Sequence, residues 1–239
     1  PELFCKREDP KELIKRLDNP DVVGFSNYVW NTEWNIAMSK HIKEVYPECL
    51  VVFGGPNVWL GMDAEYPHID VILQREGEFA FIDLLRMHRD GEAIPKYLSG
   101  ERIHDLGELV DPYETGEFDW LVKDNPDYRW NGTFETNRGC PFSCTFCDWG
   151  SLTYAKVKKF PMEKVYQEIE WLGANKIEYI FMADANFGIF PDRDMPITDY
   201  ILDVQARTGF PATVNANWHK NAKQNVLEIV KKFISNGFN

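Results

Sequence analysis

Three cysteines stand close together near the middle of the chain, and their type and spacing suit them to chemistry. Cys140, Cys144 and Cys147 follow the pattern Cys-x3-Cys-x2-Cys, in a stretch that also contains Gly139 and Pro141. A loop of this composition can turn three thiolates toward one point. A closed zinc site, or an iron–sulfur cluster held only by protein, normally has four ligands. Three thiolates on a four-iron cluster would leave one iron open for a non-protein ligand, which indicates chemistry rather than scaffolding.

The residues around these cysteines carry a family resemblance. Arg-Gly-Cys-Pro spans residues 138–141, and the aromatic Phe146 stands directly before the last cysteine. With the cysteine spacing, this resembles the cluster motif of the radical S-adenosylmethionine (SAM) enzymes. The resemblance implies that Cys140, Cys144 and Cys147 hold a 4Fe-4S cluster and that Phe146 lies by the adenine of SAM. In this family the open iron chelates the methionine part of SAM, and one electron from the cluster cleaves SAM to a 5'-deoxyadenosyl radical.

A zinc knuckle is the alternative interpretation of the same cysteines. His104, His219 or an acidic residue would complete its ligand set. The protein would then be a zinc-stabilised binding module rather than an enzyme. Metal analysis separates the two, since a zinc site holds one zinc and absorbs no visible light, whereas an iron–sulfur cluster is coloured.

The composition indicates a folded, acidic protein. A chain of 239 residues has room for one large or two modest domains. With 26 basic and 38 acidic residues the net charge is -12, which repels phosphate backbones and anionic lipid, so we expect no nucleic acid and no membrane as partner. Apolar runs such as residues 50–53 are too short to cross a bilayer. An odd number of cysteines, three of them clustered, favours a reducing cytoplasm, so we expect a cytoplasmic protein.

Apolar runs alternate with helix patterns in the first part of the chain. We predict strands at 22–25, 50–53 and 69–73 and helices at 33–45 and 79–89. Continuous apolar strands separated by helices are typical of a parallel sheet covered on both faces. The sequence therefore predicts an α/β, doubly wound domain over residues 1–92. Its ligands should lie at the carboxyl ends of the strands, in the loops at 26–32, 54–57 and 76–78.

Small and polar residues follow two of these strands. Ser26 ends the first strand, and Gly54 and Gly55 end the second. In this setting they resemble the cobalamin-binding domain that precedes the catalytic domain in one branch of the radical SAM enzymes. The resemblance implies that all three residues contact cobalamin, the glycines by letting a flat ligand lie against the backbone. The Asp-x-His-x-x-Gly motif of the wider family is missing, so either it lies upstream of Pro1 or cobalt has no histidine ligand.

Strands and helices alternate again beyond residues 93–130, a segment punctuated by proline and glycine that we expect to connect two domains. We predict strands at 132–136, 177–182 and 212–215 and helices at 161–172, 196–208 and 221–235. Chemistry on the loop after the first strand is typical of a barrel with its active site at the carboxyl ends of its strands. The resemblance to the radical SAM enzymes implies a partial (β/α) barrel, so residues 131–239 are expected to form its first half, three β/α units.

Two polar residues end the second of these strands. Asp184 and Asn186 fall where the family contacts the amino group of SAM, although the usual Gly-Gly-Glu sequence is missing here. An N-cap role is the alternative for both.

The resemblance as a whole implies a cobalamin-dependent radical SAM enzyme, in a chain that begins at Pro1 and is expected to be a fragment. Methyl transfer to an unactivated carbon is the implied reaction, with ring formation or rearrangement as alternatives. The implied partners are a small-molecule or peptide substrate and an electron donor such as flavodoxin or ferredoxin. A truncated chain that is inactive alone is a further alternative.

Overall fold

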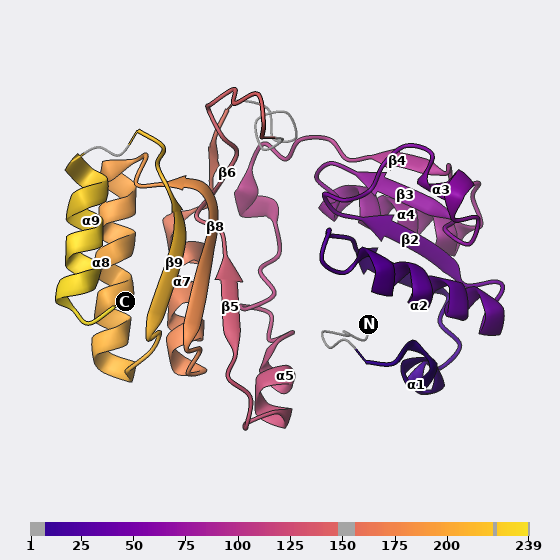
Figure 1. Cartoon of the computed structure of the whole chain (residues 1–239), viewed down its shortest axis with the longest axis horizontal. Helices are drawn as coiled ribbons and strands as arrows, with labels where there is room; N and C mark the ends of the chain where they lie inside the picture. Colours follow the sequence, from indigo (N-terminus) through magenta and orange to yellow (C-terminus); the bar gives the residue numbers. More distant parts are fainter. Residues whose placement is uncertain (1–7, 148–155, 222–223, 239) are drawn as a thin grey trace. The chain divides into compact units, whose positions relative to one another are not determined.

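The computed structural model describes residues 8–147, 156–221 and 224–238. The chain divides into two compact units, Pro1–Ile103 and His104–Asn239. Each unit combines a parallel sheet with helices, so the α/β class predicted from the sequence is confirmed (Figure 1). Within the described ranges, no helix is both long enough and apolar enough to span a bilayer.

The segment expected to connect two domains, residues 93–130, is divided between the units. Tyr97–Ser99 forms the last strand of the first sheet. In the second unit the ring of Tyr113 lies 4.9 Å from the ring of Trp171 and 5.1 Å from that of Phe118. Parts of this segment, although it has the composition of a linker, are thus packed within the first unit and other parts within the second. The domain bounds at residues 92 and 131 stay predictions.

The first unit contains a parallel four-stranded sheet. Its strands, paired in this order, are β1 (Val22–Ser26), β2 (Leu50–Gly54), β3 (Val71–Gln74) and β4 (Tyr97–Ser99). Its helices are α1 (Pro10–Leu13), η1 (Ile14–Arg16), α2 (Thr32–Val45), α3 (Met62–Glu65) and α4 (Glu78–Asp90).

Both faces of this sheet are covered. Phe53 of β2 packs with Met38 of α2 on one face, whereas its neighbour Val52 packs with Leu84 of α4 on the other. Successive strand residues point to opposite faces, so a strand covered on both sides must be apolar throughout. This explains why the strands read as unbroken apolar runs in the sequence.

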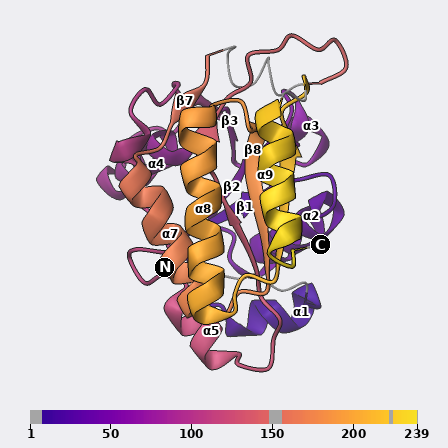
Figure 2. The same ribbon diagram turned by 90° about the vertical axis from the view of Figure 1, so that its left-hand side faces the viewer.

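The second unit contains a parallel three-stranded sheet and a separate short hairpin. The sheet has the order β5 (Asn131–Phe134), β8 (Tyr179–Phe187) and β9 (Thr213–Trp218), and the hairpin pairs β6 (Asn137–Arg138) with β7 (Lys158–Lys159). The helices are η2 (Leu106–Glu108), α5 (Asp119–Asp124), α7 (Met162–Ala174), α8 (Pro191–Thr208) and α9 (Gln224–Ser235). Figure 2 shows α8 and α9 lying side by side outside the sheet.

Helix α7 packs closely on the sheet. Its buried face carries Val165, Ile169 and Leu172, whose spacing of four and then three residues places them on one side of a helix. Opposite them stands Gly132 of β5, where a Cβ atom would lie only 2.4 Å from a methyl group of Leu172. The absence of a side chain at Gly132 therefore sets the distance between β5 and α7.

Helix α8 begins five residues earlier than predicted. Pro191 occupies its first turn, where a missing N–H is tolerated, and Pro196, the expected start, lies inside the helix. Asp194 explains the early start, because its Oδ2 accepts hydrogen bonds of 2.9 Å from the backbone N–H groups of Gly188 and Phe190. Burial raises the pKa of Asp194 to about 6.

Candidate functional site

The three cysteines follow β5 and β6, on the loop at the carboxyl end of the first strand of the second unit. All three are free thiols; Cys140 is buried, and Cys144 and Cys147 are partly exposed. Gly139 has φ +115°, a left-handed conformation that favours glycine, so it lets the chain turn directly into Cys140. The backbone N–H of Cys147 donates to the carbonyl of Cys144 at 3.3 Å, which makes a tight turn between them.

Asp184 holds the segment that leads into this loop. Its Oδ1 accepts from the backbone N–H groups of Thr136, at 2.7 Å, and Asn137, at 2.9 Å. Its Oδ2 accepts from the hydroxyl of Thr136 at 2.6 Å. The side chain is fully buried, and burial raises its pKa to about 7. Both oxygens accept hydrogen bonds from the protein, so Asp184 supports this segment, and its expected contact with SAM stays a prediction.

Asn186, two residues further along β8, contacts the first cysteine. Its Nδ2 donates to the Cys140 sulfur at 3.1 Å, and both side chains are almost completely buried. The other amide atom, Oδ1, is also buried and has no hydrogen-bond partner among the described residues. The structure therefore brings Asn186 to the cysteine loop and leaves its amide oxygen available.

Lys220 reaches the same sulfur atoms and was not among the residues expected at the site. Its Nζ lies 3.4 Å from the Cys144 sulfur and 3.9 Å from the Cys140 sulfur, and 5.5 Å from the ring centre of Phe142. Lys220 follows β9, so it comes from the carboxyl end of the strand next to β8. That position was the available signal, because polar residues after barrel strands gather at one end.

The two histidines considered as zinc ligands have other neighbours. His104 Nδ1 lies 3.3 Å from Lys158 Nζ, and the ring of His219 lies 5.6 Å from that of Phe142. In the described part of the chain, no three His, Cys, Asp or Glu side chains are grouped to hold one metal ion.

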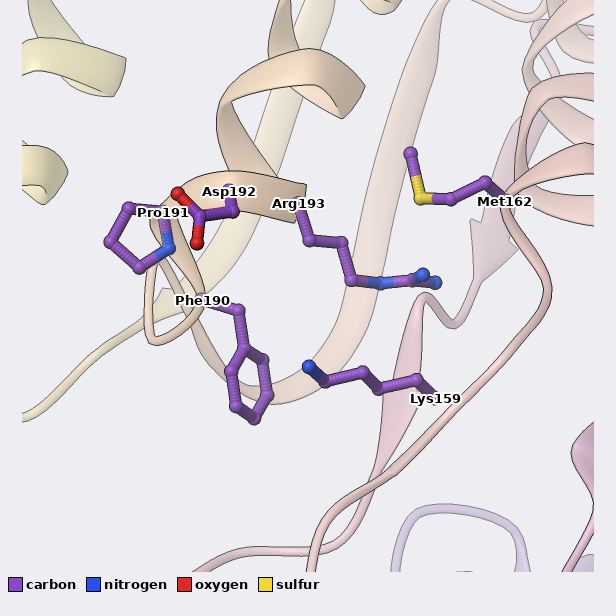
Figure 3. A pocket seen from close by; sticks show the side chains of 6 residues that line it. All are labelled: Lys159, Met162, Phe190, Pro191, Asp192 and Arg193. Carbon is purple, nitrogen blue, oxygen red and sulfur yellow. The ribbon is translucent and has the colours of Figure 1, made fainter.

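Residues of β7, the start of α7 and the start of α8 line a recess of about 370 Å³. Figure 3 shows its lining residues, which are Lys159, Met162, Phe190, Pro191, Asp192 and Arg193. The guanidinium of Arg193 donates to the carbonyls of Thr136, at 2.8 Å, and Phe160, at 2.7 Å. Lys159 places its ammonium 3.7 Å from the ring centre of Phe190. Arg193 thus holds Thr136 through its carbonyl, while Asp184 holds its N–H and hydroxyl.

In the first unit, the structure brings Ser26, Gly54 and Gly55 together at the carboxyl ends of β1 and β2. Ser26 and Gly54 are partners in the strand register. Gly55 has φ +102°, and a Cβ atom there would lie 2.7 Å from the carbonyl oxygen of Asn27. Only glycine therefore fits where the two loops meet, and the loops present bare backbone.

A network of asparagines fixes these loops and was missed in the sequence. Asn27 is fully buried; its Nδ2 donates to the carbonyl of Asn57 at 2.7 Å, and its Oδ1 accepts from Asn35 Nδ2 at 3.0 Å. Asn57 lies 30 positions beyond Asn27, so the available signal in the sequence was a polar residue directly after Ser26. The network joins the loops after β1 and β2 to α2.

Large apolar side chains are exposed beside this network. Trp30 stacks on Tyr28 with ring centres 4.5 Å apart and is 64% exposed, and Leu60 is 68% exposed. Exposed apolar groups at strand ends are typical of a surface that receives a ligand. In the third predicted loop, 76–78, the side chain of Glu76 accepts a hydrogen bond from the backbone N–H of Ile103.

Comparison with known proteins defines the class to which this fold belongs. No protein-family model matches the chain. The structure resembles that of OxsB, a cobalamin-dependent S-adenosylmethionine radical enzyme, with a TM-score of 0.62 and 19% identity over 94% of this chain and 35% of that one. It also resembles the radical S-adenosylmethionine methyltransferase TsrM from Kitasatospora setae, with a TM-score of 0.58 and 16% identity over 96% of this chain and 49% of that one. At these identities the likeness shows the fold.

Similarity in sequence to curated relatives defines the family more closely than the fold does. The chain is 37% identical to the 2-(S-pantetheinyl)-carbapenam-3-carboxylate methyltransferase of Streptantibioticus cattleyicolor and 37% identical to the cobalamin-dependent radical SAM methyltransferase TokK of Streptomyces tokunonensis. Each match covers 92% of this chain and 35% of the relative. The chain therefore belongs to the cobalamin-dependent radical SAM family, and it spans about a third of the length of these relatives.

Proposed function

We propose that this chain binds a 4Fe-4S cluster and SAM in its second unit and cobalamin in its first, and that it serves methyl transfer to an unactivated carbon. The observation that carries the proposal is the loop with Cys140, Cys144 and Cys147, joined to β8 through the contact between Asn186 and Cys140. Two relatives named methyltransferases support the reaction type. Solved neighbours that contain cobalamin, SAM or a 4Fe-4S cluster support the cofactors.

The residues of the second unit fit a cluster and SAM. Three free thiols on one loop provide soft sulfur ligands, which iron–sulfur clusters require. The buried, unpartnered Oδ1 of Asn186 can accept a hydrogen bond from the amino group of SAM. Phe146 exposes 90% of its surface, so its ring is free to pack against adenine. Asp184 would support the cysteine loop by holding the backbone of Thr136 and Asn137, which precede it.

The residues of the first unit fit a large flat ligand. Ser26, Gly54 and Gly55 offer a hydroxyl and exposed backbone at the strand ends, and the exposed side chains of Trp30 and Leu60 add apolar surface. In doubly wound folds, ligands bind at the carboxyl ends of the parallel strands.

When bound, the cluster supplies the electron that cleaves SAM to a radical, and cobalamin supplies the methyl group. The chain's own part is to hold the cofactors in place and exclude water and oxygen. A relative named for a carbapenam carboxylate supports a small molecule as substrate. An electron donor such as flavodoxin or ferredoxin would provide the electron.

Anaerobic reconstitution with iron and sulfide tests the proposal. We expect about four irons per chain and a visible iron–sulfur spectrum. Cys144→Ala should lose most of both. Cys49→Ala, which alters a buried cysteine of the first unit, is the matched control and should keep them. One tightly bound zinc with no visible absorbance, or a Cys144→Ala variant with unchanged iron, would contradict the proposal and favour the binding module.

A further inference from the structure

Two nitrogen donors meet the cysteine sulfurs from neighbouring strands. Asn186 at the end of β8 donates to the Cys140 sulfur at 3.1 Å, and Lys220 after β9 lies 3.4 Å from the Cys144 sulfur. Lys220 also lies 3.9 Å from Cys140, so the Cys140 sulfur faces both donors. Neither residue belongs to the cysteine loop.

The backbone holds both donors in place. The carbonyl of Asn186 accepts from the N–H of Ile189 at 3.2 Å, which forms a turn at the end of β8. The N–H of His219, directly before Lys220, donates to the carbonyl of Phe187 at 2.9 Å. The segment with Lys220 is therefore bound to the strand with Asn186, and the donors form one arrangement.

We propose that Asn186 and Lys220 set the reduction potential of the cluster by donating to the sulfurs of Cys140 and Cys144, an inference that rests on the proposed function. Reduction adds negative charge, which spreads onto the sulfur ligands. A donor N–H or a cation beside those sulfurs stabilises the reduced state more than the oxidised state. Both residues therefore raise the potential and make the cluster easier to reduce by a cellular donor.

The two donors differ in a way that an experiment can separate. Asn186 is 2% exposed and neutral, so its effect comes from a hydrogen bond shielded from solvent. Lys220 is exposed and carries a full charge, so dissolved ions screen its effect. Removal of Asn186 should lower the potential at any salt concentration, whereas removal of Lys220 should lower it most at low salt.

The test is a redox titration of the anaerobically reconstituted full chain, followed by paramagnetic resonance of the reduced cluster. At the wild-type midpoint potential, Asn186→Leu should show a ratio of reduced to oxidised cluster lower by about tenfold, which corresponds to about 59 mV for one electron. Lys220→Met should show a similar loss in low salt that shrinks in about 1 M salt, where the Debye length is about 3 Å. Lys220→Arg, which keeps the charge, should restore most of the potential.

Two control variants account for general effects. Asn217→Leu removes an amide that donates to the carbonyl of Asp184 and not to a sulfur. Lys231→Met removes an exposed lysine on α9. Both should keep the wild-type potential.

Unchanged potentials in Asn186→Leu and Lys220→Met, with iron retained, would overturn the inference while the proposed function stands. If Asn186→Leu fails to hold iron, the comparison of Lys220→Met with Lys220→Arg tests the inference by itself. Equal reduction potentials for these two variants would overturn it. A wild-type chain that takes up no iron would instead overturn the proposed function and this inference together.

Discussion

A single buried carboxylate determines where the cysteine loop begins. Asp184 accepts three hydrogen bonds from Thr136 and Asn137, across 48 and 47 positions of the sequence. A carboxylate can accept several N–H bonds at once, whereas an alanine leaves these buried donors without partners. The position of Cys140, three residues beyond Asn137, therefore depends on a residue of another strand, Asp184 of β8.

Replacement of Asp184 by alanine should weaken both the fold and the site. We expect Asp184→Ala to lower the free energy of unfolding by about 2–4 kcal/mol, because buried donors lose their partners. Denaturant unfolding measures this, and iron content after reconstitution should fall as well. Asp192→Ala, which removes an exposed carboxylate at the start of α8, is the matched control. Equal stability of the two variants would show that Asp184 does not support the loop.

At the scale of elements, the meeting of the loops after β1 and β2 depends on a close approach of backbones. Gly55 and Gly61 both have positive φ, +102° and +92°. A Cβ atom at Gly55 would clash with Asn27, whereas nothing lies within 4 Å of one at Gly61. Both positions have the backbone strain of a positive φ, but only Gly55 has the steric contact between the loops. A comparison of substitutions at Gly55 and Gly61 therefore separates the two effects.

Gly55→Ala should destabilise the first unit more than Gly61→Ala. Left-handed backbone costs an alanine about 1–2 kcal/mol at either position, and the clash with Asn27 adds to this only at Gly55. Thermal unfolding measures the difference. Under the proposed function, binding of hydroxocobalamin, followed by its absorbance, should weaken in Gly55→Ala and persist in Gly61→Ala. Equal behaviour of the two variants would contradict the close approach.

A second element contact makes stability depend on pH. Glu168 of α7 and Asp111 are both buried. Burial, and then the charge of Asp111, raise the pKa of Glu168 from 4.5 to about 9. The folded state therefore keeps a proton that the unfolded state has lost between pH of about 4.5 and about 9. A proton held only by the folded state makes stability fall as pH rises through this window.

Glu168→Gln should flatten this dependence. One proton contributes a slope of at most about 1.4 kcal/mol per pH unit, and the uncharged glutamine removes that contribution. Unfolding free energies measured from pH 5 to 9 in wild type and variant give the two slopes. The variant should be the more stable of the two at alkaline pH. Parallel curves would show that Glu168 is ionised in the folded protein at neutral pH.

For the whole molecule, the sequence predicts the regular elements well and the contacts between them poorly. Residues 22–25 and 50–53 are recognisable as strands because a sheet covered on both faces requires continuous apolar runs. The strand β4 and the four-residue α3 are too short to show a period, and both fall outside the predicted elements. The start of α8 was misplaced because either Pro191 or Pro196 can open a helix.

In the candidate site too, the local motif could be predicted from the sequence, whereas the residues that contact it from elsewhere in the chain could not. The cysteine spacing lies within eight residues, so its chemistry can be read locally. Lys220, Arg193 and Asn27 contribute through contacts with residues at least 30 positions away. No local pattern marks such partners, because the fold alone brings them together.

Thr136 has its N–H, its hydroxyl and its carbonyl all engaged, the first two by Asp184 and the last by Arg193. A shift of this residue along the sheet would break every one of these bonds in the same instant. The segment that precedes the cysteines is therefore held rigidly at Thr136. Under the proposed function, we expect any change of backbone conformation on cofactor binding to occur after Gly139, within the cysteine loop.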